Sequence, residues 1–213
     1  LRHAEESVNR VLSRVEVLNP RVRHVPHPAE EHPGADHQLL GLVQRDPRQR
    51  GEIERQIGLA KELIQREDVR SGDAAIIISN SGRNAVPVEM ALEMTALEVK
   101  VIAITNLEQS LASSATHSSG KRLCELAAVT IDNCVPQGDA LVSLPGLAPK
   151  LGPSSTVAGA AIINAIVIEA VSELLQRGEL VPVLPSANVE GVSENTLRDL
   201  LAPYKSRIKH LDV

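Results

Sequence analysis

Two short aliphatic segments, separated by the length of one helix, restrict the fold of this chain more than any other feature. Residues 74–79 read AAIIIS and residues 99–105 read VKVIAIT, with many β-branched side chains and almost no polar alternation. Such segments are typical of strands buried on both faces, as in a parallel sheet that helices cover. Small and apolar residues recur at helical spacing between them, over about residues 85–97. The spacing predicts a βαβ unit.

The segments on either side extend this unit. Residues 128–132 (AVTID) and 181–184 (VPVL) are strand-like, and residues 139–156 carry the prolines and glycines of an irregular β excursion. Apolar spacing predicts helices at about residues 4–15, 51–66, 120–127, 155–176 and 193–201. Together these elements predict an α/β fold, a three-layer αβα sandwich around a parallel, flavodoxin-like sheet of four or five strands.

Composition excludes several classes of function. The 213 residues carry 22 Lys and Arg against 27 Asp and Glu, a net charge of −5, with one Tyr and neither Phe nor Trp. A mildly acidic chain without aromatic stacking platforms is not expected to bind nucleic acid. No apolar run approaches the roughly 18 residues of a membrane span, and no signal peptide is visible, so we expect no membrane span. Cys124 and Cys134 are expected to be buried thiols in a reducing compartment, and the protein is expected to be cytoplasmic.

The loop SNSGRN, residues 79–84, lies where the first strand gives way to the helix. In a doubly wound sheet, ligands bind at this edge, where helix N-termini offer unpaired N–H groups to an anion such as phosphate. Hydroxyls of Ser79 and Ser81 and the amide of Asn84 would add donors, and Gly82 would let the backbone approach closely. The same residue types also make ordinary turns and helix caps, so the pattern alone favours neither reading.

The stretch IISNSGRNAVPVEMALE, followed by VKVIAIT, resembles the SIS (sugar isomerase) phosphosugar-binding domain family, whose signature is a Ser-x-Ser-Gly-x-Thr loop. HSSGKRLCELAAVTIDN, GDALV, GPSSTV and SANV resemble an uncharacterised bacterial branch of that family whose members are labelled phosphoheptose-isomerase-like. The resemblance implies that the phosphate ligands are Ser79, Asn80, Ser81, Gly82 and Asn84. It also implies that the sugar pocket is lined by Thr105, Ser154, Ser155 and Thr156, although the last three would equally serve as a helix cap.

The resemblance also implies a strand and a Gly-Thr-Gly/Ser-type loop before the first helix, and nothing in this sequence matches them. We therefore expect residues 1–49 to form an N-terminal helix and a Pro/His-rich loop without the first SIS strand. Residues 50–213 are expected to form the SIS domain.

An isomerase needs a base that moves a proton between adjacent carbons. His117 precedes a predicted helix and Glu125 lies within it, so both are candidate catalytic residues. The alternative for Glu125 is an ordinary surface pair with Lys121, four residues earlier.

Four histidines occur close together near the N-terminus, which invites a metal interpretation; they are His24, His27, His32 and His37. Their spacing is irregular and no Cys accompanies them, so a surface loop is favoured over a zinc site. We expect neither a metal nor a cofactor.

The resemblance implies that the chain binds a phosphorylated sugar and, if catalytic, interconverts aldose and ketose forms. A non-catalytic phosphosugar sensor and an amino-sugar phosphate etherase or lyase are the alternatives. SIS domains commonly pair, and small residues at the start of the helix at 155–176 would suit a homodimer interface.

Overall fold

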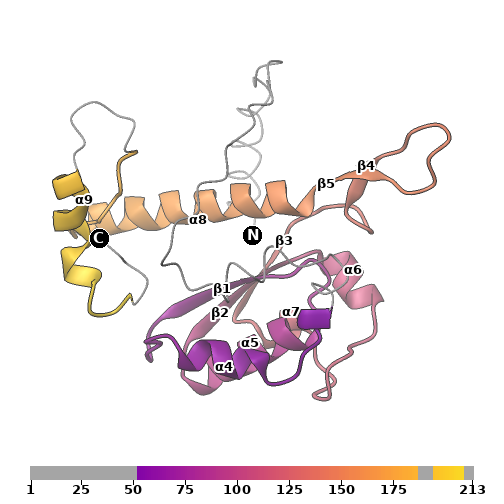
Figure 1. Cartoon of the computed structure of the whole chain (residues 1–213), viewed down its shortest axis with the longest axis horizontal. Helices are drawn as coiled ribbons and strands as arrows, with labels where there is room; N and C mark the ends of the chain where they lie inside the picture. The colour runs from indigo at the N-terminus through magenta and orange to yellow at the C-terminus, as the bar shows by residue number, and fades with distance from the viewer. Residues whose placement is uncertain (1–51, 187–193, 209–213) are drawn as a thin grey trace, which may run out of the picture. The chain divides into compact units, whose positions relative to one another are not determined.

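The computed structural model describes residues 52–186 and 194–208, and its second compact unit, Gln56–Val213, holds every element below. The first half of this unit contains α4 (Leu59–Gln65), β1 (Ala74–Ile78), α5 (Ala85–Ala96), β2 (Lys100–Thr105), α6 (Leu107–Ala112), α7 (Leu123–Leu126) and β3 (Val129–Asp132) (Figure 1). The second half contains β4 (Ala140–Val142), β5 (Leu151–Pro153), α8 (Ser155–Gln176), α9 (Glu194–Leu201) and the 3-10 helix η1 (Ala202–Tyr204).

The predicted βαβ unit is confirmed. β1, β2 and β3 form a parallel sheet in that order, with Ile76 opposite Ile102 and Ile104 opposite Ile131. Within the described residues this sheet has three strands, where we expected four or five. β4 and β5 instead pair with each other as an antiparallel hairpin.

The strand expected at residues 181–184 is not present. Pro182 has no N–H to donate to a ladder, and the N–H of Val183 donates to the carbonyl of Val181 at 3.0 Å. This local turn replaces the pairing with a neighbouring strand.

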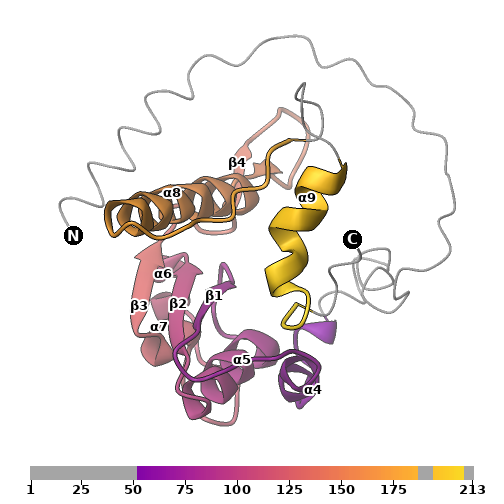
Figure 2. The same ribbon diagram turned by 90° about the vertical axis from the view of Figure 1, so that its left-hand side faces the viewer.

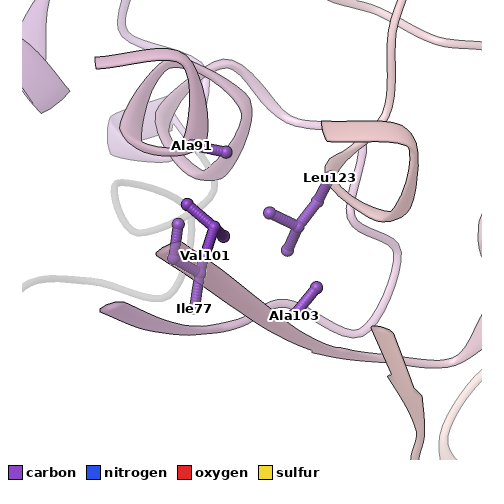
Figure 3. Packing of buried hydrophobic residues seen from close by; sticks show 5 residues of the cluster. All are labelled: Ile77, Ala91, Val101, Ala103 and Leu123. Carbon is purple, nitrogen blue, oxygen red and sulfur yellow. The ribbon is translucent and has the colours of Figure 1, made fainter. Parts of the chain in front are cut away.

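Helices α4, α5 and α7 lie on one side of the sheet in both views (Figures 1 and 2). Apolar side chains from α5, α7 and the first two strands meet between them and make the core seen in Figure 3; they are Ile77, Ala91, Val101, Ala103 and Leu123. Leu123 and Ala103 are fully buried, so the core is built from aliphatic residues, as the composition requires.

The opposite face of the sheet is more open than the sequence suggests. α8 touches it where a Cβ at Gly159 would lie 3.6 Å from Ile78 Cγ2. Ile76 remains 39% exposed and Val129 52% exposed. The prediction that these strands are buried on both faces is therefore wrong for the described part of the chain. The mixed α/β architecture is nevertheless consistent with an αβα sandwich.

α8 also corrects the expectation about membrane spans. Its 22 residues are apolar enough, and long enough, to cross a membrane by length and composition, which is weak evidence because core helices of soluble proteins pass the same test. Within the described residues it is the one helix of this kind.

Candidate functional site

The loop at residues 79–84 joins the carboxyl end of β1 to the start of α5, as predicted. Asn84 is the N-cap residue, with extended backbone. The N–H groups of Ala85 and Val86 follow it and belong to the first helical turn, which has no carbonyl partners inside the helix. Pro87 brings no N–H of its own. Two backbone donors at the positive end of the helix dipole therefore face the loop.

Gly82 fixes the shape of this loop. Its φ is +59°, in the left-handed region that side chains with a Cβ disfavour. A Cβ at this position would lie 3.1 Å from Thr105 Oγ1 and 3.3 Å from both Leu123 Cβ and Ser110 Oγ. The carbonyl of Gly82 accepts the Leu123 N–H at 2.7 Å, so the loop is anchored to the start of α7. Only glycine fits here without rearrangement.

The two serines of the loop differ in their partners. The Ser79 hydroxyl oxygen accepts the Gly82 N–H at 3.2 Å, which leaves its own proton available for donation. The Ser81 hydroxyl, in the described part of the chain, has no hydrogen-bond partner, and Ser81 is half-buried. Both hydroxyls can therefore donate to an anion.

Thr105 has a structural role in this state. Its side chain is fully buried and its hydroxyl donates to the carbonyl of Asn80 at 3.0 Å. The predicted sugar-pocket residue thus lies directly beneath the loop and supports it.

The side chain of Asn80 points into a network of amides. Its Oδ1 accepts from Asn133 Nδ2 at 3.0 Å, and its Nδ2 donates to Gln109 Oε1 at 3.4 Å. Gln109 Oε1 also accepts the Gly138 N–H at 3.3 Å. The loop after β1, helix α6 and the loop after β3 are therefore joined through side-chain amides.

Sequence reasoning did not single out Asn106, Gln109 or Asn133. Asn106 caps α6 by accepting the Gln109 N–H at 2.9 Å and donates to the Val135 carbonyl at 2.6 Å. Asn106 and Asn133 each follow directly on the last residue of a strand. The carboxyl ends of parallel strands meet at one edge, so this position was a signal that could have found them.

His117 pairs with a residue that the sequence did not suggest. Its Nε2 lies 3.5 Å from Glu89 Oε1, with the two side chains 8% and 14% exposed. The Ser119 N–H donates to His117 Nδ1 at 3.2 Å, so the proton of the neutral ring lies on Nε2 and faces Glu89. Glu89 Oε2 accepts the Gly58 N–H at 2.8 Å. The pair joins three segments of the chain.

This pair lies next to the loop. The hydroxyl of Thr116 donates to the carbonyl of Arg83 at 2.6 Å, which brings the segment ahead of His117 against residues 79–84.

Glu125 acts as a cap of α7. Its Oε2 accepts the Arg122 N–H at 2.8 Å and lies 3.2 Å from Arg122 Nη1. The helix begins at Leu123, later than expected, so Lys121 lies before it and the predicted pair of Lys121 with Glu125 is replaced by Arg122 with Glu125.

The carboxylate of Asp139 caps the start of α8. Its carboxylate accepts from the backbone of Ser154 at 2.9 Å, the backbone of Ser155 at 2.6 Å and the Ser155 hydroxyl at 2.8 Å. Burial alone would raise the pKa of Asp139, but the hydrogen bonds from Ser155 and Ser154 outweigh it and hold the pKa below its ordinary value. Thr156 is exposed. Ser154 holds the N-cap position but makes no side-chain cap hydrogen bond, so the cap of α8 is the carboxylate of Asp139 and not the hydroxyl of either serine.

The two cysteines and the N-terminal histidines complete the residues that the sequence analysis named. Cys124 is partly buried, with Sγ 3.6 Å from Ser110 Oγ, whereas Cys134 is exposed, against expectation. Across residues 52–186 and 194–208, no cluster of three metal-ligating side chains occurs. The four N-terminal histidines, His24, His27, His32 and His37, lie outside these ranges.

Comparison with known proteins gives the same family as the motifs. The family model described as SIS domain matches residues 28–106, which include the loop at 79–84 and β2. UPF0309 proteins are similar over a longer stretch. The one from Geobacillus thermodenitrificans is 40% identical over 156 residues, which cover 73% of this chain and 62% of that protein. The one from Thermoanaerobacter pseudethanolicus is 39% identical over 160 residues, covering 74% and 64%. The chain thus spans less than two thirds of the length of these relatives.

Proposed function

The chain belongs to the SIS domain family, and on that premise we propose that it binds a phosphorylated sugar, with the phosphate held by the loop at residues 79–84. The observation that carries this proposal is the left-handed Gly82, which curves the loop around the start of α5. The proposed donors are the hydroxyls of Ser79 and Ser81, the Asn84 amide and the first N–H groups of α5. Gly82 contributes by its shape, because its own N–H is used by Ser79.

Charge supports an anionic ligand here. Arg83 lies within the loop, and no described carboxylate forms an ion pair with it. An unpaired guanidinium beside a helix N-terminus favours a phosphate group through both charge and dipole.

The sugar would extend from the phosphate toward the residues around the carboxyl edge of the sheet. The Gln109 contacts with Asn80 and Gly138 bring the segment before Asp139 to this edge. Ser154, Ser155 and Thr156 follow from there and are proposed to border the sugar, as the family resemblance implies.

Aldose–ketose isomerisation is the proposed reaction if the protein is an enzyme. His117 then acts with Glu89, because the pair is close to the loop and combines a carboxylate with an imidazole proton donor. Glu125 is a weaker candidate than it was from the sequence, because its carboxylate holds the start of α7.

Two further functions use the same loop. A non-catalytic sensor would bind a phosphosugar without turnover, and an etherase or lyase would cleave an amino-sugar phosphate. No observation on the described residues favours either over isomerisation.

We also propose that the protein is a homodimer that pairs through α8. This helix leaves Val157 72%, Ile168 64% and Leu175 60% exposed. Their spacing places them on one face of the helix, and an exposed apolar face of this kind marks an interaction site in soluble proteins.

A panel of hexose, heptose and amino-sugar phosphates tests these proposals. Binding is followed by calorimetry and products by NMR. An aldose–ketose product that disappears in His117→Ala or Glu89→Gln, and persists in Glu125→Gln, supports the isomerase with the pair proposed above. Loss of turnover in Glu125→Gln at unchanged stability would return Glu125 to the catalytic set. Binding without any product supports the sensor, and failure of every sugar phosphate to bind overturns the proposed function.

A further inference from the structure

Two loops and helix α6, all at the carboxyl ends of the strands, are joined by a chain of side-chain amides. The positions of oxygen and nitrogen are fixed at both ends of this chain. At one end, the Val135 N–H donates at 3.3 Å to the side chain of Asn133, so the atom it meets must be the oxygen Oδ1. At the other end, the Gly138 N–H donates at 3.3 Å to the side chain of Gln109, so that atom must be Oε1. A backbone N–H can only donate, which removes the usual ambiguity between amide oxygen and nitrogen.

The orientation of Asn80 follows from these two ends. With Oδ1 of Asn133 facing Val135, Nδ2 of Asn133 faces Asn80 at 3.0 Å and requires an acceptor there. With Oε1 of Gln109 facing Gly138, that oxygen requires a donor from Asn80, and Asn80 Nδ2 lies 3.4 Å away. Both demands are met by one rotamer of Asn80 and by no flipped alternative.

The Asn80 side chain is thus turned away from the role of phosphate ligand. Its oxygen is an acceptor, which an anion does not need, and its nitrogen is directed at Gln109. Its backbone carbonyl is held as well, by the Thr105 hydroxyl at 3.0 Å and the Asn106 N–H at 3.0 Å. Within the described residues, every polar group of Asn80 therefore has a hydrogen-bond partner, except its backbone N–H and one proton of its side-chain amide.

Asn133 is the anchor of this arrangement. It is 8% exposed, and its N–H donates to the carbonyl of Thr105 at 3.0 Å, which ties it to the end of β2. A buried amide held by backbone on two sides gives Asn80 a rigid partner 53 residues away in the sequence.

We propose that Asn133 and Gln109 are positioning residues of the phosphate loop, acting through the Asn80 side chain, which is itself a positioning group and not a ligand. The proposal rests on the proposed function for its ligand. It predicts that the loop loses affinity for phosphate when any link in the chain of amides is removed, and that removing a second link costs little more.

The test is a double-mutant cycle in the 213-residue chain, with inorganic phosphate as the probe and ³¹P NMR titration as the readout. Asn133→Ala and Asn80→Ala should each weaken phosphate binding about tenfold, as for one lost hydrogen bond near a charged group. The double variant should bind about as weakly as either single variant, because both substitutions break the same contact. Losses that multiply would overturn the proposal, because they would make Asn80 an independent ligand. Asn195→Ala, an exposed amide on α9 that accepts from Arg198, should bind like the unaltered chain.

A second measurement separates this inference from the proposed function. In ¹H–¹⁵N spectra of the ligand-free protein, Asn133→Ala should shift the backbone signals of Ser81 and Gly82 and the side-chain signals of Asn80 and Gln109. Those shifts without any phosphate binding would leave the positioning role standing and overturn the proposed ligand. Phosphate binding together with unchanged Ser81 and Gly82 signals in Asn133→Ala would support the proposed ligand and overturn the positioning role.

Discussion

Thr105 packs directly against Gly82: its Oγ1 lies 3.1 Å from where a Cβ on the glycine would stand. The threonine hydroxyl is already committed to the Asn80 carbonyl, and its side chain is fully buried, so it has little room to move. The contact connects the end of β2 with the proposed phosphate loop, and it makes the loop sensitive to one methyl group.

We therefore expect Gly82→Ala to lower the free energy of unfolding by about 2–5 kcal/mol, measured by urea denaturation. A left-handed alanine costs about 1–2 kcal/mol and an overpacked contact typically about 1–3 kcal/mol. Gly120→Ala is the matched control, because Gly120 has φ +68° and no atom within 4 Å of the added Cβ. Gly120→Ala should lose only the free energy of placing an alanine in the left-handed region. Equal losses in the two variants would show that Thr105 does not press on the loop.

Asp139 gives a prediction about pH. Its pKa is lowered in the folded chain, because the hydrogen bonds from Ser155 and Ser154 outweigh the opposing effect of burial. A lowered carboxyl pKa stabilises the fold above the unfolded pKa of about 3.9, and this contribution is lost as the pH falls through the folded pKa.

Asp139→Asn should thus lower the free energy of unfolding at pH 7 by about 1 kcal/mol, the usual effect of a weakened helix cap. The difference between the unaltered chain and the variant should shrink as the pH falls below about 4. Urea denaturation at a series of pH values measures it. A difference that stays constant to pH 2 (about two units below the unfolded pKa) would mean that the Asp139 charge does not hold the start of α8.

The apolar surface of α8 predicts a change in oligomeric state. Ile168→Lys, at a position 64% exposed, should convert a dimer into a monomer, because it places a charge in the proposed interface. Light scattering after size exclusion measures the mass. Leu180→Lys is the control, since Leu180 is 98% exposed and lies beyond the end of the helix. A monomeric starting protein, or a dimer that survives Ile168→Lys, would contradict pairing through α8.

The hydroxyl and amide donors of the loop predict a loss of affinity. Ser81→Ala and Asn84→Ala should each weaken binding of a sugar phosphate by about 1–3 kcal/mol, as expected for a hydrogen bond to a charged group. Isothermal calorimetry provides the measurement. Ser71→Ala is the control. Ser71 precedes β1, at the amino ends of the strands and away from the loop, and its hydroxyl donates to Glu98. Its removal should leave the affinity unchanged. Unchanged affinity in both loop variants would refute these ligands.

The sequence was informative where local pattern and tertiary structure agree. The aliphatic runs marked β1 and β2, and small residues followed by Gly178 marked α8 to its end residues. Sequence patterns did not predict the partners of side chains whose contacts lie far away in the sequence. Nothing local to Asn133 indicates a partner at Asn80, and nothing local to Asp139 indicates that it caps a helix 16 residues later.

Two side chains have partners that the sequence did not suggest, for the same reason. Glu125 looked like half of a surface pair or a catalytic base, but α7 starts at Leu123 and places it where a carboxylate caps the helix. Asn80 is a predicted phosphate ligand by its place in the motif, and helix α6 and the loop after β3 supply partners for both of its amide atoms. The position of a residue in a motif shows which functional group is present there, but it does not show which distant residue that group contacts in the folded chain.

A crystal structure of the protein soaked with a hexose or heptose phosphate tests the central proposal most directly. We expect phosphate oxygens within hydrogen-bond distance, about 2.7–3.2 Å, of the Ser81 hydroxyl and the first N–H groups of α5. Density for the phosphate elsewhere on the molecule, with residues 79–84 unoccupied, would contradict it.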